Sequence, residues 1–145
     1  MTTTIVVGLD GSEASARAAE SAAAEARREG ARLLLVCVIP WSPYSFAPAE
    51  ENERRHIEKE REIAGARERV LDPLLARLRE GGGVEVEGAI RHGHPAETLV
   101  SLAREHGAGR IVVGRTGQSR VRTLLFGSTP SNLIQLSPLP VTVVP

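Results

Sequence analysis

Three glycines, a serine and a threonine form the most distinctive pattern in the chain, within "GRTGQSRVRTLLFGSTPSNLI" at residues 114–134. The five residues are Gly114, Gly117, Gly127, Ser128 and Thr129. Glycine lets main-chain N–H groups turn toward an anion, and a following helix adds unpaired N–H donors and the positive end of its dipole. The pattern therefore predicts a phosphate site. The alternative is a surface loop that binds nothing.

Two common nucleotide motifs are absent from the sequence. The pattern G-x-x-x-x-G-K-[ST] does not occur, and no G-x-G-x-x-G follows the first apolar run. Any phosphate contact would depend on backbone N–H groups, with Ser128 at the helix start as a further donor. Arg115, Arg120 and Arg122 either neutralise phosphates or are solvated, and the sequence favours neither interpretation.

The elements that would position this loop alternate between strands and helices. Continuous apolar runs predict buried parallel strands at residues 4–9, 33–39, 111–114 and 141–144, and alternation predicts an edge strand at 84–90. Helices are expected at 12–30, at 50–80 with a kink or break at Asp72-Pro73, at 95–107, and from near Ser128 to Pro138. This order predicts an α/β fold: one domain, 1–145, with a doubly wound parallel sheet.

In such sheets, ligands bind beyond the carboxyl ends of the strands, where the winding reverses. The first strand ends in "LDGS", which places Asp10 there. Asp10 either lies near a ligand or caps the first helix together with Ser12. The loop "WSPYSFAPAEEN" at 41–52 is interpreted either as a lid or as a surface connection.

Composition and isolated residues exclude several other functions. The 145 residues carry a formal net charge of zero, unlike a general binder of nucleic acid or acidic membranes. Cys37 is the only cysteine, and "RHGH" with His92 and His94 offers too few ligands for zinc, so a turn with partly exposed histidines is preferred. No catalytic constellation is evident, which favours binding without real turnover. We expect a cytoplasmic protein, because no leader or membrane span is evident.

The last strand carries a separate prediction. A short apolar strand at 141–144 would lie at an edge of the sheet, and bare edges pair readily. A twofold partner that adds the same strand would cover it and form a homodimer. The alternative is that the short strand and the final proline protect the edge.

Taken together, the motifs resemble the universal stress protein family. The spacing G-x2-G-x9-G-[ST] is accompanied by "IVVGLDGSEAS", "GHPAETLVSLA" and "PLPVTVVP", so the resemblance covers essentially the whole chain. It implies a five-stranded Rossmann-like sheet in the order 3-2-1-4-5 and a homodimer, in a family that includes ATP-binding and non-binding members. It places Asp10 near the nucleotide and its Mg or Mn ion, and Val38 near adenine. The residues implied to hold phosphates and ribose are Gly114, Gly117, Gly127, Ser128 and Thr129.

One position departs from the family pattern. Pro130 follows Thr129 where the family usually has an apolar residue and then Ser or Ala, and proline removes an N–H donor, although Ser131 could compensate. The leading hypothesis is an ATP-binding homodimeric stress-response module. The alternatives are a nucleotide-free interaction protein of the same fold and, less favoured, a weak ATPase or adenylyl transferase, whose H-x-G-H and S-G-G-x-D-S signatures are absent.

Overall fold

A parallel sheet lies between two layers of helices. The computed structural model describes residues 2–40, 49–115 and 128–145. The strands are β1 (Thr4–Leu9), β2 (Arg32–Ile39), β3 (Val86–His92), β4 (Ala108–Gly114) and β5 (Val141–Val144). They form a five-stranded sheet in the order β3-β2-β1-β4-β5, and every neighbouring pair is parallel. This confirms the predicted fold class and strand order.

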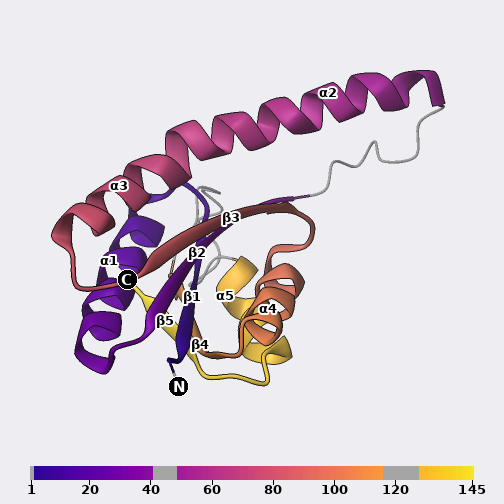
Figure 1. Ribbon diagram of the computed structural model, residues 1–145. Coiled ribbons are helices and arrows are strands. Elements are labelled where there is room, and N and C mark those ends of the chain that lie inside the picture. The colour runs from indigo at the N-terminus through magenta and orange to yellow at the C-terminus, as the bar shows by residue number, and fades with distance from the viewer. Residues whose placement is uncertain (1, 41–48, 116–127) are drawn as a thin grey trace.

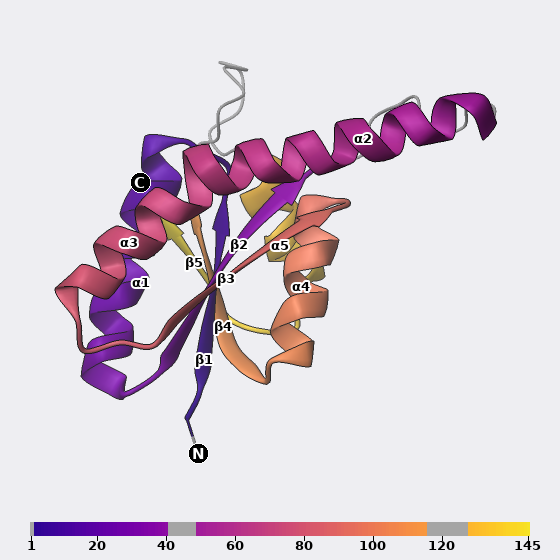
Figure 2. The ribbon, with the colours of Figure 1, turned by 45° about the horizontal axis from the view of Figure 1, so that its top comes forward.

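The helices divide between the two faces of the sheet. They are α1 (Glu13–Glu29), α2 (Ala49–Ala66), the π-helical turn η1 (Arg67–Leu71), α3 (Asp72–Gly81), α4 (Pro95–Glu105) and α5 (Ser128–Leu136). Figure 2 shows α1 and α3 on one face and α4 and α5 on the other. In Figure 1, α2 runs past the carboxyl ends of the strands, and its N-terminal part projects beyond the sheet.

Helix α1 begins and ends where its sequence predicts. The Ser12 hydroxyl caps it by accepting from the N–H of Ser15 at 3.1 Å, and Gly30 ends it with a left-handed φ of 69°. One face of the helix carries small buried residues, which let it approach the sheet closely. They include the predicted stripe of Ala14, Ala18, Ala22 and Ala26.

The long helical segment is divided as the Asp72-Pro73 pair predicted, but through an unusual turn. Pro73 lies in the first turn of α3 and has no N–H to offer the carbonyl of Arg69. Next to it, the N–H of Asp72 donates to the carbonyl of Arg67, five residues back, which is the spacing of a π-helix. The segment therefore consists of two α-helices joined by the wider turn η1.

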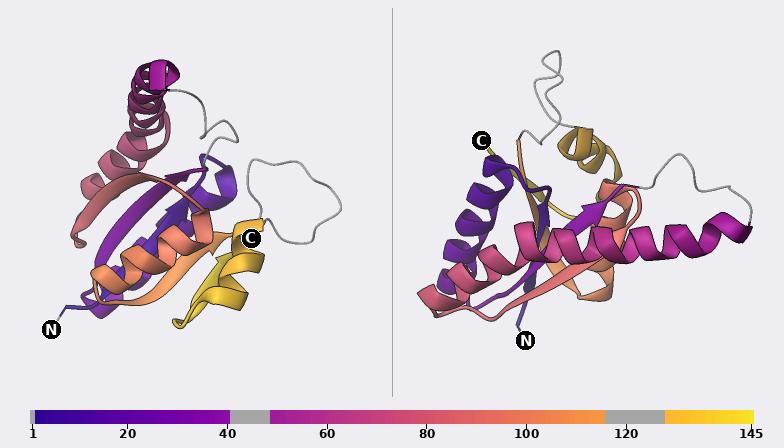
Figure 3. Two further views of the ribbon diagram at one scale, coloured as in Figure 1. Left: turned by 90° about the vertical axis from the view of Figure 1, so that its right-hand side faces the viewer. Right: turned by 90° about the horizontal axis from the view of Figure 1, so that it is seen from above.

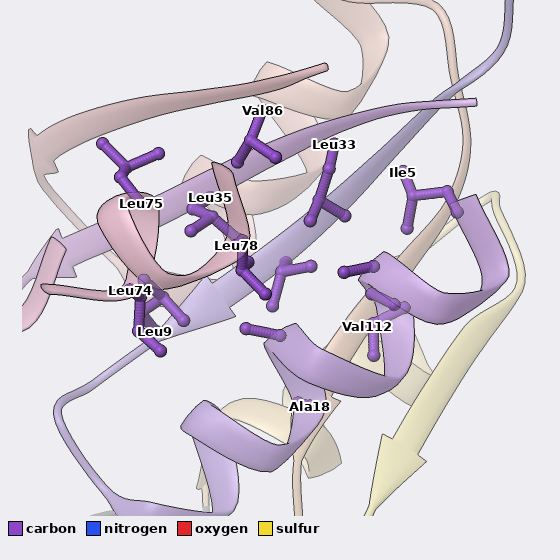
Figure 4. Close-up of a cluster of buried hydrophobic side chains, with 14 of the residues drawn as sticks. Ile5, Leu9, Ala18, Leu33, Leu35, Leu74, Leu75, Leu78, Val86 and Val112 are labelled. Carbon is purple, nitrogen blue, oxygen red and sulfur yellow. The ribbon is translucent and has the colours of Figure 1, made fainter. Parts of the chain in front are cut away.

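Two apolar cores hold the layers together. Figure 4 shows side chains of β1, β2, β3 and β4 meeting those of α1 and α3 in one of them. The other core packs α4 and α5 on the opposite face, with Val36, Leu99 and Leu133 almost completely buried. Because both faces of the central strands are covered, these strands are apolar throughout, as the sequence predicted.

Three strands differ from their predicted bounds because pairing, not composition, fixes their ends. Strand β2 begins at Arg32, one residue earlier than predicted, because Arg32 pairs with Thr4. Strand β3 is the predicted edge strand, but it begins at Val86 and continues to His92, which pairs with Ile39 at the end of β2. Strand β4 begins at Ala108, three residues earlier than predicted, because Ala108 pairs with Thr4 directly after the left-handed Gly107.

Candidate functional site

A cavity of about 780 Å³ opens at the carboxyl ends of β1, β2 and β4. The strand order reverses between β1 and β4, where ligands bind in sheets of this kind. Of the sequence-predicted site residues, Asp10, Val38, Gly114 and Thr129 all line this cavity. Parallel strands end at one edge of the sheet, which explains how residues so far apart in the chain are brought together. Their role in binding stays a prediction.

Of the two roles proposed for Asp10 from the sequence, the structure shows the one at the start of α1, and contact with a ligand stays a prediction. Asp10 Oδ1 accepts from the N–H of Ser12 at 2.9 Å, so the carboxylate stabilises the turn that leads into α1. Its own N–H donates to the Ser15 hydroxyl at 3.4 Å. The residue is nevertheless exposed and lines the cavity, so a carboxylate oxygen remains available to a ligand or a ligand-bound cation.

The end of β2 gives the cavity an apolar floor. Cys37, Val38 and Ile39 line it, followed by Pro40. Cys37 is only 5% exposed, and burial together with the negative charge of Asp10 raises the pKa of its thiol above the ordinary value. A neutral thiol among aliphatic side chains suits a flat apolar group better than a charged one.

One side of the cavity, the β4–α5 wall, consists of Val113, Gly114, Thr129 and Pro130. A Cβ atom on Gly114 would lie 2.7 Å from the carbonyl carbon of Ala14 and 2.8 Å from the nitrogen of Ser15. The close approach of α1 thus requires a glycine here with or without a ligand. Helix α5 begins at Ser128, so Pro130 lies in its first turn and removes one of the unpaired N–H donors there.

The opposite side, the α2–η1 wall, was not anticipated from the sequence. It consists of Glu62, Ala66, Arg69 and Val70. Glu62 Oε2 lies 3.0 Å from His92 Nε2, which joins α2 to the end of β3. The only signal for this wall in the sequence was the interruption at Asp72-Pro73, which marks a change in the helix but not what the helix faces.

The two histidines of "RHGH" have separate structural roles. The side chain of His92 is 11% exposed and pairs with Glu62, and is therefore more buried than expected. His94 caps α4 by accepting from the N–H of Glu97 at 3.4 Å. Across residues 2–40, 49–115 and 128–145, no three His, Cys, Asp or Glu side chains gather as a metal site.

Some predicted residues cannot be placed. Gly117 and Gly127 lie outside the described residues, as do Arg120, Arg122 and the segment 41–48. Arg115 is exposed, and its N–H donates to the carbonyl of Val144 in β5. Its side chain is not among those that line the cavity.

Comparison with known families identifies the chain. A model of the universal stress protein family matches residues 1–145. This chain belongs to the universal stress protein family. The resemblance noted from the motifs is thereby confirmed.

Relatives differ in how much of their length the chain covers. A universal stress protein of Thermus aquaticus is 35% identical over 97% of both chains. The universal stress protein Rv1996 of Mycobacterium tuberculosis is 28% identical over 97% of this chain but only 47% of its own length. The chain thus spans about half the length of the first curated relatives it matches.

Solved structures share the fold. Universal stress protein UspA from Lactobacillus plantarum superposes with a TM-score of 0.86, at 24% identity, over 99% of this chain and 97% of that one. A universal stress protein in complex with cAMP has a TM-score of 0.70 at 28% identity, over 99% of this chain and 96% of that one. In the described part of this universal stress protein, no helix is both long and apolar enough to cross a membrane.

Proposed function

We propose that this universal stress protein binds an adenine nucleotide, ATP, in the cavity at the β1–β4 reversal and acts as a homodimeric stress-response module. The observation that carries the proposal is that Asp10, Val38, Gly114 and Thr129, from separate parts of the chain, line one cavity. The solved relative in complex with cAMP supports an adenine nucleotide as the ligand class.

The cavity offers different chemistry at its two ends. The apolar floor formed by Cys37, Val38 and Ile39 suits the base. The start of α5, with the N–H groups of Ser128 and Thr129 and the positive end of the helix dipole, suits the phosphates. Gly117 and Gly127 would add donors from the loop between β4 and α5. Asp10 would contact Mg or Mn only together with bound nucleotide.

We propose binding without rapid turnover. The described carboxylates of the cavity are Asp10, whose Oδ1 accepts from Ser12, and Glu62, which pairs with His92. Asp10 stabilises the turn before α1 and Glu62 is paired, so at most a weak ATPase is expected. Measurement of ADP or AMP release from ATP over hours tests this.

Calorimetric titration tests the binding proposal directly. ATP, AMP and cAMP would be titrated with and without magnesium, with GTP as the matched control for the base. We expect saturable heat for the adenine nucleotides, and a matching rise in the melting temperature. The absence of both heat and thermal shift at millimolar ATP would exclude the proposal.

Two observations favour a second candidate, a nucleotide-free interaction protein. Gly114 is already required by the packing of α1, and Pro130 lacks a donor where phosphates would bind. This candidate predicts that the protein purifies without nucleotide and that ATP leaves its melting temperature unchanged. Release of a stoichiometric adenine nucleotide on denaturation, seen by mass spectrometry, would exclude it.

The homodimer is proposed to form through β5. In the described sheet β5 pairs only with β4, and Ile134 and Leu136 of the adjacent α5 are 62% and 50% exposed. The carbonyls of Pro140 and Val144 accept from β4, so by alternation the N–H of Val143 points away from the sheet.

Val143→Pro therefore removes an outward N–H but no bond to β4. Proline is tolerated at an edge when its N–H side faces solvent. We expect at least about a tenfold weaker dimer with the fold retained, measured by light scattering and circular dichroism, and Val143→Thr as control. A wild-type monomer, or a Val143→Pro dimer of unchanged affinity, would contradict assembly through this edge.

A further inference from the structure

Arg69 is the only basic residue among the described residues that line the cavity. It lies in the π-helical turn η1, and neither the motifs nor the comparisons assign it a role. The neighbouring Arg67 pairs with Asp72. No carboxylate of the described chain lies within ion-pair distance of Arg69, so its charge is not committed to a protein partner there. A guanidinium that has no carboxylate partner and lies on the wall of a ligand-sized cavity is well placed to contact a ligand.

The guanidinium of Arg69 is held against its own helix. Its Nε donates to the carbonyl of Gly65 at 3.3 Å. A Cβ built on Gly65 would lie 2.5 Å from Arg69 Nη2, and the three nearest heavy atoms all belong to Arg69. The guanidinium of Arg69 therefore packs against Gly65, and any larger residue at position 65 would displace the guanidinium. Arg69 is exposed, and this hydrogen bond directs its side chain along α2 on the cavity side.

The wall that carries Arg69 is itself fixed to the sheet. Leu71 is completely buried, and a Cβ on Gly88 of β3 would lie 2.8 Å from its Cδ1. The contact between Glu62 and His92 ties α2 to the end of β3 one turn before the π-helix. The position of Arg69 relative to the strand ends is thus set by buried packing on one side and by a polar contact on the other.

We propose that Arg69, packed against Gly65, contacts the face of the purine base of the bound nucleotide and increases the affinity of the protein for that nucleotide. Ala66 and Val70 flank Arg69 on the same wall, and the apolar floor of Cys37, Val38 and Ile39 adjoins it. This is the end of the cavity suited to the base. A planar guanidinium stacks on aromatic faces and tolerates differences at the base edge.

A phosphate contact is the competing role for Arg69. Helix α5, whose start suits phosphates, covers the face of the sheet opposite the one that η1 and α3 cover, as Figure 3 shows in two views. Arg69 and the start of α5 therefore approach the cavity from opposite sides. The inference rests on the proposed function, since it specifies the contact made by the base of the same nucleotide.

The test compares Arg69→Gln with Arg61→Gln, which removes the same charge from an exposed position of α2 outside the cavity. Affinities for adenosine, AMP and ATP are measured by calorimetry or competition. We expect Arg69→Gln to weaken all three by the same factor, about three- to tenfold, and Arg61→Gln to bind as wild type does. Arg69→Lys keeps the charge but loses the planar guanidinium, so we expect a smaller loss than in Arg69→Gln.

Gly65→Ala offers a variant that separates binding from folding. Alanine is the better helix former, so we expect the melting temperature to rise by about 3 °C while affinity for adenosine falls. In the Arg69→Gln background, Gly65→Ala should have no further effect on affinity, because the group that it displaces is gone. This double-mutant cycle identifies Arg69 as the route of the effect.

The outcomes distinguish the inference from the proposed function. If wild type binds neither adenosine nor any adenine nucleotide, the proposed function is wrong and the inference is wrong with it. If wild type binds them and Arg69→Gln matches Arg61→Gln, only the inference is wrong. A loss confined to ATP, with adenosine binding unchanged, would assign Arg69 to the phosphates and overturn the contact with the base.

Discussion

The two walls of the cavity face the same space but are constructed differently. On the β4–α5 wall the backbone comes close to its neighbours, because Gly114 has no side chain and lies against the first turn of α1, and the first turn of α5 begins at Ser128. The α2–η1 wall is made of side chains, with Arg69 and Glu62 held by contacts outside the cavity. The comparison shows that a glycine motif marks positions where backbone segments approach closely. A charged residue of the cavity, in contrast, can lie on a helix that carries no recognisable motif.

The largest effect is expected from Gly114→Ala on the β4–α5 wall. The added Cβ would meet backbone atoms of Ala14 and Ser15 at 2.7–2.8 Å, and backbone cannot rotate away as a side chain can. We expect a loss of about 3 kcal/mol in the free energy of unfolding, measured in urea without ligand. Gly109→Ala on the same strand meets only the Thr3 methyl group and is the control. Unchanged stability in Gly114→Ala would mean that this glycine serves the ligand alone.

A smaller loss is expected from Gly88→Ala, which acts on the α2–η1 wall. Its Cβ would meet the side-chain ends of Leu71 and Leu75 at 2.8–3.0 Å, and these can shift at some cost because Leu71 is completely buried. We expect about 1.5 kcal/mol of destabilisation. Nucleotide affinity should also fall, because displacement of Leu71 moves η1 and Arg69. A stability loss with no change in affinity would show that the wall does not contact the ligand.

The same contrast explains what the sequence could and could not predict. The fold was predictable because apolar runs, the alanine stripe of α1 and the stop at Gly30 each act locally. Asp10 and the stretch that begins at Gly114 could be grouped because parallel strands end at one edge, whereas Val38 was placed with them through the resemblance to the universal stress protein family. The residues of the α2–η1 wall could not be predicted in this way, because the position of the wall depends on the contact between Leu71 and Gly88, which belong to different elements. Helical periodicity gives no sign of which residues face a cavity.

Pro130→Ala is expected to strengthen the β4–α5 wall. The substitution restores an N–H in the first turn of α5 without changing any charge. If phosphates bind there, ATP affinity should rise about fivefold, the effect of about 1 kcal/mol from one added hydrogen bond, while adenosine affinity stays constant. Calorimetry with both ligands checks this. An equal gain for adenosine would point to a general change in the helix and not to a phosphate contact.

The smallest effect concerns Cys37, which lies at the floor between the two walls and is the only cysteine of the chain. Burial is the main cause of the raised pKa of its thiol, and the charge of Asp10 raises the pKa further. Because the thiolate is the reactive form, removing that charge in Asp10→Asn should lower the pKa of Cys37 and speed alkylation by iodoacetamide at pH 8 by about two- to threefold. The rates of the two proteins should converge at higher pH, where both thiols are ionised.

Glu62→Gln, on the α2–η1 wall, is the matched control for this measurement. It also removes one negative charge from the cavity lining, but Glu62 is not among the groups that raise the pKa of Cys37. Its alkylation profile against pH should therefore follow wild type. A shift in Glu62→Gln as large as that in Asp10→Asn would mean that the field at the floor comes from the α2–η1 wall as well as from Asp10. The α2–η1 wall would then act on the floor electrostatically, although the difference in packing between the two walls would stand.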